Sequence, residues 1–345
     1  MGKGHVGDPG FYLFGMGDRP KMLYRSGRLL DAMTRQTIAR LPVRSERIMP
    51  AEYRVEWTAT DGSSGAIFED DSGVWLRHGP DLRPLAQSSL SLPRFEASPH
   101  AATLRVLHHE LLINIVAGRP LPSLFVYPRP WLRDGAMVAM ALERTGNAPL
   151  LADWIGSLRD PFDRNNAGHR EPDNLGQTLY LVSLASSAAH PVVEAVLAAA
   201  EGVRRGDHIA GITDGQEHPV YQTKWLKFGL AALKLDDPFD IPEIADPYSS
   251  LFWMACRDRH VPAGRFDRRR RRRYPYLAWA EAHFHRDAPP MELLGAGYPM
   301  TWESSASEAD YPAMAWVSQD LAGRRTCMPH SWHAAEAFLY LIEAD

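Results

Sequence analysis

The feature that most constrains the fold is a change in hydrophobic periodicity near Pro99. Over residues 52–78 apolar and polar side chains alternate, and the turn signals Asp61-Gly62 and Asp71-Ser72-Gly73 interrupt the pattern. Alternation with a period of two is typical of a half-buried β-strand, and Asp followed by Gly or Ser marks a turn. This stretch therefore predicts a small antiparallel β-sheet.

Beyond residue 100 the apolar spacing becomes helical, and no Val- or Ile-rich alternating run interrupts it. Helices are expected over 101–117, 134–145, 148–158, 173–187, 190–204, 220–234, 247–256, 275–285, 308–322 and 330–343. This succession predicts a mainly α fold, an (α/α)6-type toroid of helical hairpins, with an α-solenoid or an irregular helical domain as alternatives. The sequence has no repeat of fixed period, which argues against a simple solenoid.

Two domains follow from this change of pattern: residues 1–95 as an N-terminal arm with the small β region, and residues 96–345 as the toroid. Residues 1–22 are expected to be irregular and 86–100 to be a linker, whereas 23–41 fits either a helix or a strand and turn. In a toroid the loops entering the inner helices converge at one end, so functional residues are expected in those loops.

Composition narrows the possible partners. The chain has 345 residues and a net charge of -4, which gives no general attraction to nucleic acid or to an anionic membrane. Its start lacks the apolar run of a signal peptide, and no segment is long enough to span a bilayer. Cys256 and Cys327 are the two cysteines, so no disulfide framework is implied. A cytoplasmic protein is therefore expected, and its oligomeric state is not indicated.

A run of six arginines, Arg268–Arg273, could form a patch for anions or nucleic acid. Its surroundings are not basic, so an exposed insertion between two helices is the favoured interpretation.

The segment 127–146 has the strongest candidate site. Two prolines hold the chain extended before a helix that Asp134 can cap, and Trp131 and Arg133 lie beside it. An aromatic ring, a guanidinium and a carboxylate at a helix start suit a sugar, because the ring stacks on its apolar face and the charged groups share its hydroxyls. A capped core helix with a structural Arg–Asp pair is the alternative.

A second set of candidates lies in two polar loops. Asp173 follows the long loop 160–172 and is either a site residue or a helix cap. Asp214 and Glu217 precede a helix that carries Lys224 and Trp225. Aromatic neighbours would partly desolvate Glu217 and raise its pKa, which suits a proton donor at neutral pH. Ordinary surface carboxylates are the alternative.

The third set is near the C-terminus. Glu303 and, as a second choice, Glu308 are carboxylates in the polar stretch 293–311, and His330 opens the last helix. The histidines show no metal-binding spacing and have no paired cysteines nearby, so neither a metal nor a cofactor is implied.

At WLRDGAMVAMAL, residues 131–142, the sequence resembles the glucoamylase-like glycoside hydrolases with an (α/α)6 toroid, the six-hairpin glycosidases. The resemblance implies that Arg133 and Asp134 hold hydroxyls of the non-reducing sugar.

Two later stretches are similar to further segments of that family. Residues 214–233 resemble the loop and helix that carry the general acid, which implies this role for Asp214 or Glu217. Glu303, with MPHSWHAAEAFLYL after it, resembles the final segment, which implies a general base. Gln216 stands where the family has a Trp before the acid.

These observations predict a carbohydrate-active enzyme that hydrolyses a glycosidic bond with inversion. Such an enzyme needs a carboxylic acid to protonate the leaving oxygen and a carboxylate to activate water. The first alternative is a polysaccharide lyase or sugar epimerase in which Tyr221, His218 or His330 abstracts a proton. The second is a non-enzymatic sugar-binding helical protein.

Overall fold

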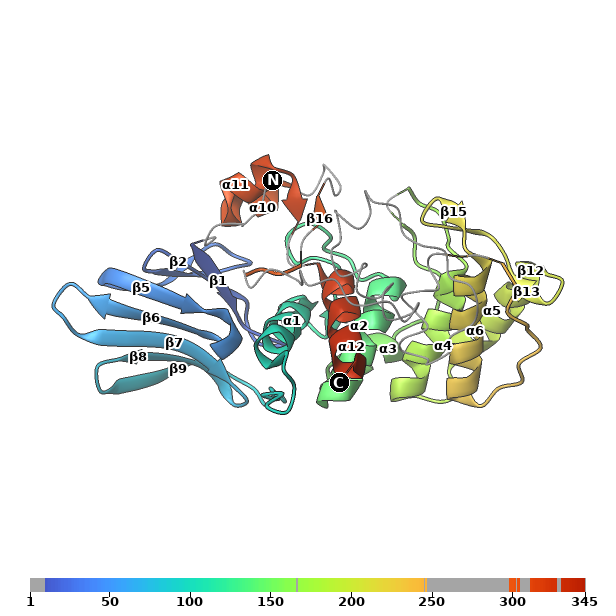
Figure 1. Ribbon diagram of the computed structural model, residues 1–345, viewed down its shortest axis with the longest axis horizontal. Coiled ribbons are helices and arrows are strands. Elements are labelled where there is room, and N and C mark those ends of the chain that lie inside the picture. Colours follow the sequence, from blue (N-terminus) through green and yellow to red (C-terminus); the bar gives the residue numbers. More distant parts are fainter. Residues whose placement is uncertain are drawn as a thin grey trace. The chain divides into compact units, whose positions relative to one another are not determined.

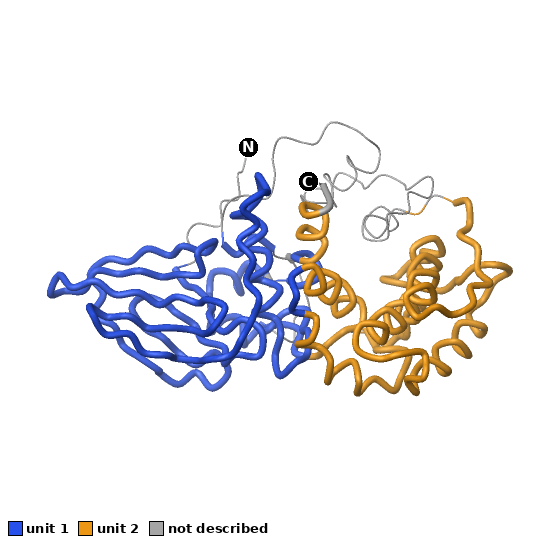
Figure 2. Tube along the Cα trace, turned by 90° about the horizontal axis from the view of Figure 1, so that it is seen from below, with its two compact units in different colours: residues 1–128, 145–147, 295–334 blue, residues 129–144, 148–294, 335–345 orange. Residues whose placement is uncertain are grey.

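The computed structural model describes residues 10–165, 167–244, 246, 298–301, 303–304, 311–327 and 330–344. The chain forms two compact units (Figure 2). Unit 1 comprises residues 1–128, 145–147 and 295–334, and unit 2 comprises residues 129–144, 148–294 and 335–345. Each unit is therefore assembled from stretches that are separate in the sequence.

Unit 1 begins with a four-stranded antiparallel meander. Its strands are β1 (Phe11–Phe14), β2 (Met22–Arg25), β3 (Arg28–Asp31) and β4 (Thr37–Arg40). Ser26 and Gly27 connect β2 to β3 with φ values of 45° and 70°. Positive φ at both central residues matches the twist of a tight hairpin.

A five-stranded antiparallel sheet follows directly (Figure 1). Its strands, in spatial order, are β5 (Val43–Met49), β6 (Arg54–Ala59), β7 (Ser64–Asp70), β8 (Gly73–His78) and β9 (Asp81–Gln87). The alternation in the sequence puts Val55, Trp57 and Ala59 of β6 on the buried face. Trp57 lies over Gly65, where an added Cβ would be 2.2 Å from the indole.

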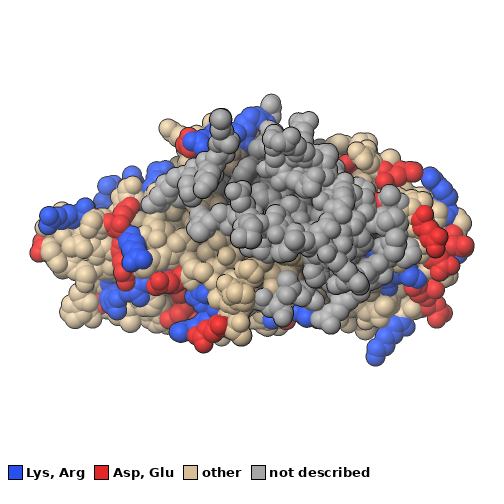
Figure 3. All heavy atoms as spheres, in the orientation of Figure 1, with Lys and Arg blue, Asp and Glu red and all other residues tan. Residues whose placement is uncertain are grey.

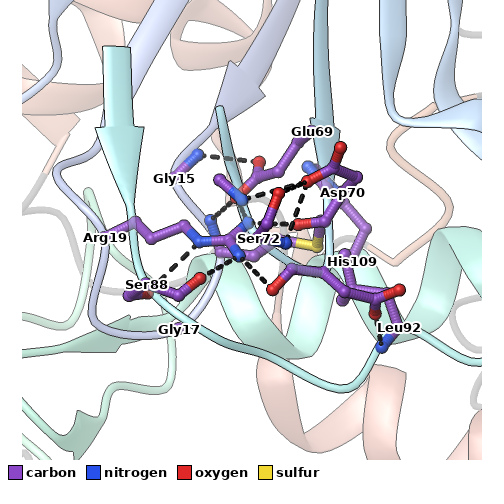
Figure 4. Close-up of polar contacts among 12 residues, drawn as sticks. Gly15, Gly17, Arg19, Glu69, Asp70, Ser72, Ser88, Leu92 and His109 are labelled. Carbon is purple, nitrogen blue, oxygen red and sulfur yellow. Dashed lines mark hydrogen bonds and ion pairs between the residues drawn. The ribbon is translucent and has the colours of Figure 1, made fainter. Parts of the chain in front are cut away.

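A buried network of charges ties the loop after β1 to strand β7 (Figure 4). Arg19 donates to Glu69 at 3.0 Å, and neither side chain is exposed. Glu69 also accepts the backbone N–H groups of Gly15 at 2.9 Å and Met16 at 2.7 Å. The carboxylate thus fixes the turn that connects β1 to β2.

Helix α1 (Ala101–Ile113) packs its histidine-bearing side against β1. His109 Nε2 is 2.7 Å from the carbonyl oxygen of Leu13, and its ring stacks on Tyr12. Glu110 of the same helix accepts the backbone N–H of Thr301 at 3.0 Å. Residues 298–301 are thereby anchored to α1.

The rest of unit 1 consists of short elements. They are η1 (Pro50–Glu52), β10 (Ile115–Val116) with β11 (Arg119–Pro120), β16 (Glu303–Ser304) with β17 (Thr326–Cys327), α10 (Tyr311–Val317) and α11 (Gln319–Gly323).

In its described residues, unit 2 is helical with two small hairpins. Its helices are α2 (Leu132–Thr145), η2 (Ala148–Leu151), α3 (Ala152–Gly156), α4 (Asp173–Ala185), α5 (Pro191–Gly202), α6 (Pro219–Leu233) and most of α12 (Ser331–Ala344). The hairpins pair β12 (Arg204–Arg205) with β13 (His208–Ile209), and β14 (Ile212–Thr213) with β15 (Gln216–Glu217).

Helices α4 and α6 lie side by side at the centre of the unit 2 core (Figure 1). Gly176 and Gly229 allow the close approach, because a Cβ on Gly176 would lie 2.0 Å from the carbonyl carbon of Trp225. Leu179, Val182 and Leu230 fill the contact with apolar side chains.

The predicted toroid is wrong, and the fold is mixed. Antiparallel sheets of four and five strands occupy most of residues 11–87, far more than a small appendage. Within the described residues, the helices longer than ten residues are α1, α2, α4, α5, α6 and α12, which is too few for the twelve of an (α/α)6 toroid. The ranges 247–256 and 275–285, where helices were expected, lie outside the described residues.

Candidate functional site

Arg133, in the first turn of α2, is the centre of a cluster of carboxyl groups in unit 2. Its Nε donates to Asp173 at 2.7 Å, and its Nη2 forms an ion pair with Glu171. Asp173 is fully buried and Glu171 is only 5% exposed. Two buried carboxylates therefore fix the orientation of this guanidinium.

Each of these carboxylates is held by a further contact. Glu171 accepts the side-chain amide of Asn165 at 3.0 Å and the backbone N–H of Asp214 at 2.9 Å. Asp173 accepts from Gln177 at 2.8 Å and from the Thr213 hydroxyl at 3.3 Å. The cluster thus joins the start of α2, the loop before α4 and the β14–β15 hairpin.

Asp163, from the same loop, is a carboxyl group with a strongly raised pKa. It accepts the backbone N–H of Leu132, and its own N–H donates to Asn174 at 3.2 Å. Burial raises the pKa of Asp163 to about 7, and the negative charge of Asp173 adds to the rise more than the Arg133 guanidinium offsets. A carboxyl group with this pKa exchanges protons readily at neutral pH, which is the property of a general acid or base.

Asp134 and Trp131 flank this cluster at the start of α2. Asp134 is 2% exposed, and its charge also contributes to the raised pKa of Asp163. The carbonyl of Trp131 accepts the N–H of Gly135 at 2.8 Å, which opens the helix, and its side chain is half-buried. Of the residues proposed from the sequence, Arg133, Asp134, Asp173 and the backbone of Asp214 therefore meet around one centre.

Glu217 lies elsewhere on the surface of unit 2. Its side chain is 47% exposed and pairs with Arg205 at 3.2 Å. The expected desolvation of Glu217 by aromatic neighbours is wrong, because Trp225 lies two turns into α6 with no exposed surface. Trp225 packs against Tyr180 and Phe228 in the core.

Lys224, two turns into α6 in unit 2, is also buried, with 2% of its surface exposed.

Two other candidates belong to unit 1. Glu303 lies in β16, where its backbone pairs with Cys327, and its side chain lies outside the described residues. His330 is 3% exposed, and its ring stacks on His333 with 4.2 Å between centroids. Glu308 and the run Arg268–Arg273 also lie outside the described residues.

A second polar pair in unit 2 involves the residue before α6. His218 Nδ1 lies 2.9 Å from Asp246, and both side chains are buried. Asp246 also accepts the backbone N–H of Tyr221 at 3.1 Å. A carboxylate in this position fixes the orientation of the imidazole.

The sequence reasoning did not assign Asp163, Glu171 and Thr213 to the site. The available signal was the loop 160–172, which is too polar for a core and too long for a simple turn. Its residues could not be ranked without knowing which of them fold back over α2.

Comparisons with family models, with curated proteins and with solved structures gave no match for this chain. The resemblance to the six-hairpin glycosidases is therefore overturned, both by this result and by the mixed fold.

Among the described residues, no helix is long and apolar enough to cross a bilayer. The same part of the chain has no group of three or more His, Cys, Asp or Glu side chains arranged to hold a metal ion.

Proposed function

We propose that unit 2 has an acid–base site that hydrolyses a glycosidic bond. The observation that supports this proposal is Asp163, a largely buried carboxyl group with a pKa of about 7 beside a fixed guanidinium. At neutral pH a large fraction of Asp163 holds a proton that it can donate to a leaving oxygen.

The role of proton donor, expected for Glu217 or Asp214 from the sequence, is therefore assigned to Asp163. Glu217 is exposed and paired with Arg205, so its surroundings resemble those of an ordinary surface carboxylate. In glycoside hydrolysis the acid has a raised pKa, whereas its partner carboxylate is ionised and activates water.

Asp214 is the proposed partner carboxylate. It lies at the exposed turn of the β14–β15 hairpin, where water has access, and its N–H ties that turn to Glu171. Arg133 and Asp134 keep the role of binding sugar hydroxyls, and Trp131 offers an apolar surface for the ring. Such sites combine a few fixed polar groups with an aromatic face.

A test compares glycosides of the same sugar that carry good and poor leaving groups. Asp163→Asn removes the proton donor, and general acid catalysis is worth about 10²–10⁴ in rate. We expect a loss of this size in kcat for poor leaving groups and near-normal kcat for 4-nitrophenyl glycosides, which need little protonation.

Glu217→Gln is the matched control and should leave both rates unchanged. Wild-type protein that hydrolyses no member of a broad glycoside panel would contradict the proposal. Equal losses for good and poor leaving groups in Asp163→Asn would contradict the assigned role.

The His218–Asp246 pair supports a second candidate, a lyase that acts on a uronate. An imidazole oriented by a carboxylate is a competent base. Tyr221 is less suited to that role, because burial raises its pKa well above its ordinary value and keeps the phenol protonated. A lyase would release an unsaturated product that absorbs in the ultraviolet, whereas hydrolysis would not.

A further inference from the structure

One face of the five-stranded sheet in unit 1 carries a groove of about 420 Å³. Its lining residues fall into three rows that run across β5 to β8. The hydroxyl row consists of Ser45, Thr58 and Ser64, which are paired in register. The charged row consists of Arg47, Glu56 and Arg77, with Ala66 paired between Glu56 and Arg77.

A third row lies between the hydroxyl row and the charged row, and its backbone forms the floor of the groove. Trp57 and Gly65 belong to this row, and their face of the sheet is the buried one. The indole of Trp57 lies against Gly65 on that face and is 3% exposed. Because side chains alternate along strands, the hydroxyl row and the charged row face outward together.

Four charged residues line the groove, and one of them, Glu46, belongs to the Trp57 row and accepts the Tyr24 hydroxyl. The two outward rows carry Arg47, Arg77 and Glu56, which leaves a positive surplus on that face. Glu56 pairs with Arg54 of the same strand at 2.6 Å. Among the described residues, neither Arg47 nor Arg77 forms an ion pair within 4.0 Å, and both are exposed. Figure 3 shows basic and acidic side chains interspersed over the visible described surface.

The spacing of the two arginines indicates the size of a ligand. Arg47 lies on β5 and Arg77 on β8, three strand intervals apart (Figure 1). Neighbouring strands are about 4.8 Å apart, so the two backbones are separated by roughly 14 Å. An extended ligand matches that separation better than a single small ion.

We propose that this groove binds an acidic oligosaccharide, in which sugar rings carry carboxylate or sulfate groups. The arginines would pair with the anionic groups, and the hydroxyl row together with Glu56 would bond to ring hydroxyls. A single-stranded nucleic acid fits less well, since its binding uses exposed aromatic rings for base stacking. Trp57 lines this groove, but its indole is buried on the other face of the sheet, and Glu56 would lie among phosphates.

This proposal depends on unit 1 alone and is independent of the reaction proposed for unit 2. Its test is isothermal titration calorimetry of the full chain at low ionic strength. The probes are a uronate-containing disaccharide, a sulfated disaccharide, the neutral disaccharide cellobiose and a single-stranded oligonucleotide.

We expect saturable binding of an acidic disaccharide and weak or no binding of cellobiose. The variant Arg47→Gln/Arg77→Gln should bind the acidic disaccharide at least about tenfold more weakly, because two charge-assisted contacts are lost. The stronger of the two acidic probes identifies the anionic group.

Arg83→Gln is the control. Arg83 is exposed on β9, but it lies opposite Leu76 rather than opposite Arg77, so its side chain is on the other face of the sheet from the groove. The Arg83→Gln variant should bind the acidic disaccharide as the wild type does, and the melting temperatures of all variants should agree. The proposal is overturned if neither acidic probe binds, if cellobiose binds equally well, if Arg83→Gln loses as much affinity, or if the oligonucleotide binds more tightly.

Discussion

Individual buried charges in this protein are satisfied in different ways. Glu69 pairs with a guanidinium and accepts two backbone N–H groups. Glu110 is fully buried and, among the described residues, accepts from backbone and hydroxyl donors in segment 298–301 and from no cation. Asp163 accepts the backbone N–H of Leu132 and feels the charges of two carboxylates and of the Arg133 guanidinium. These contrasts lead to separate predictions at the residue scale.

Arg19→Met should destabilise the protein strongly, because it leaves the fully buried Glu69 carboxylate without its cation. Removal of one partner from a buried ion pair typically costs about 3–5 kcal/mol of unfolding free energy. Urea unfolding measures this cost. Arg94→Met is the control, since the Arg94–Glu96 pair is 3.8 Å apart and both side chains are more than three-quarters exposed. Equal stability of the two variants would contradict the assigned role of Glu69.

Glu110 should make stability depend on pH. Burial raises its pKa to about 7 in the folded protein, compared with about 4.3 in an unfolded chain. The unfolded state loses its proton first, so the contribution of Glu110 is fully present below about pH 4.3. It falls as the pH rises and is lost through about pH 7.

The measurement compares urea unfolding of wild type and Glu110→Gln between pH 4 and pH 8. The amide does not titrate, so the wild type should lose more stability than the variant over this range, by on the order of 3 kcal/mol. Glu96→Gln, at an exposed position, should follow the wild-type curve. Parallel curves for wild type and Glu110→Gln would show that Glu110 titrates normally.

At the scale of elements, the crossing of α4 and α6 positions the site, because α4 begins with Asp173 and its partner Thr213 precedes α6. Gly176→Ala should destabilise the protein by about 1–3 kcal/mol or more, since the new Cβ would lie 2.0 and 2.2 Å from the Trp225 carbonyl atoms and 2.3 Å from the Leu226 nitrogen. Thermal unfolding tests this effect. Gly202→Ala, at the end of α5 with nothing within 4 Å, should be neutral or slightly stabilising. A neutral Gly176→Ala would contradict the close crossing.

The sequence predicted some elements well and missed others for identifiable reasons. The strands β6, β7 and β8 lie within the predicted range 52–78, because each has one buried face. The expected irregular arm is wrong at β1, whose four residues are all buried and therefore show no alternation. The expected single helix 308–322 is interrupted at Ser318, whose hydroxyl accepts from Leu321 and starts α11.

The site was predictable only in part for a related reason. Arg133 and Asp134 were recognisable, because they follow two prolines and open a helix. Asp163 was not, since its pKa depends on burial by residues distant in sequence. Glu217 looked desolvated because aromatic residues follow it, yet the β14–β15 hairpin leaves it exposed.

At the scale of the whole molecule, the two proposed activities lie in different units (Figure 2). Unit 1 presents an exposed polar groove on a sheet, and unit 2 encloses a cluster of carboxyl groups around Arg133. The reaction proposed for unit 2 depends on this cluster, and above all on the protonation state of Asp163.

That state can be measured directly. Side-chain carboxyl resonances of the ¹³C-labelled full chain can be followed by NMR between pH 3 and pH 9, in wild type and in Asp163→Asn. We expect an aspartate carboxyl resonance that titrates with a pKa of about 7 in the wild type and is missing from the variant. If the resonance lost in Asp163→Asn instead titrates near the ordinary aspartate value of about 3.9, Asp163 is ionised at neutral pH and cannot be the proton donor.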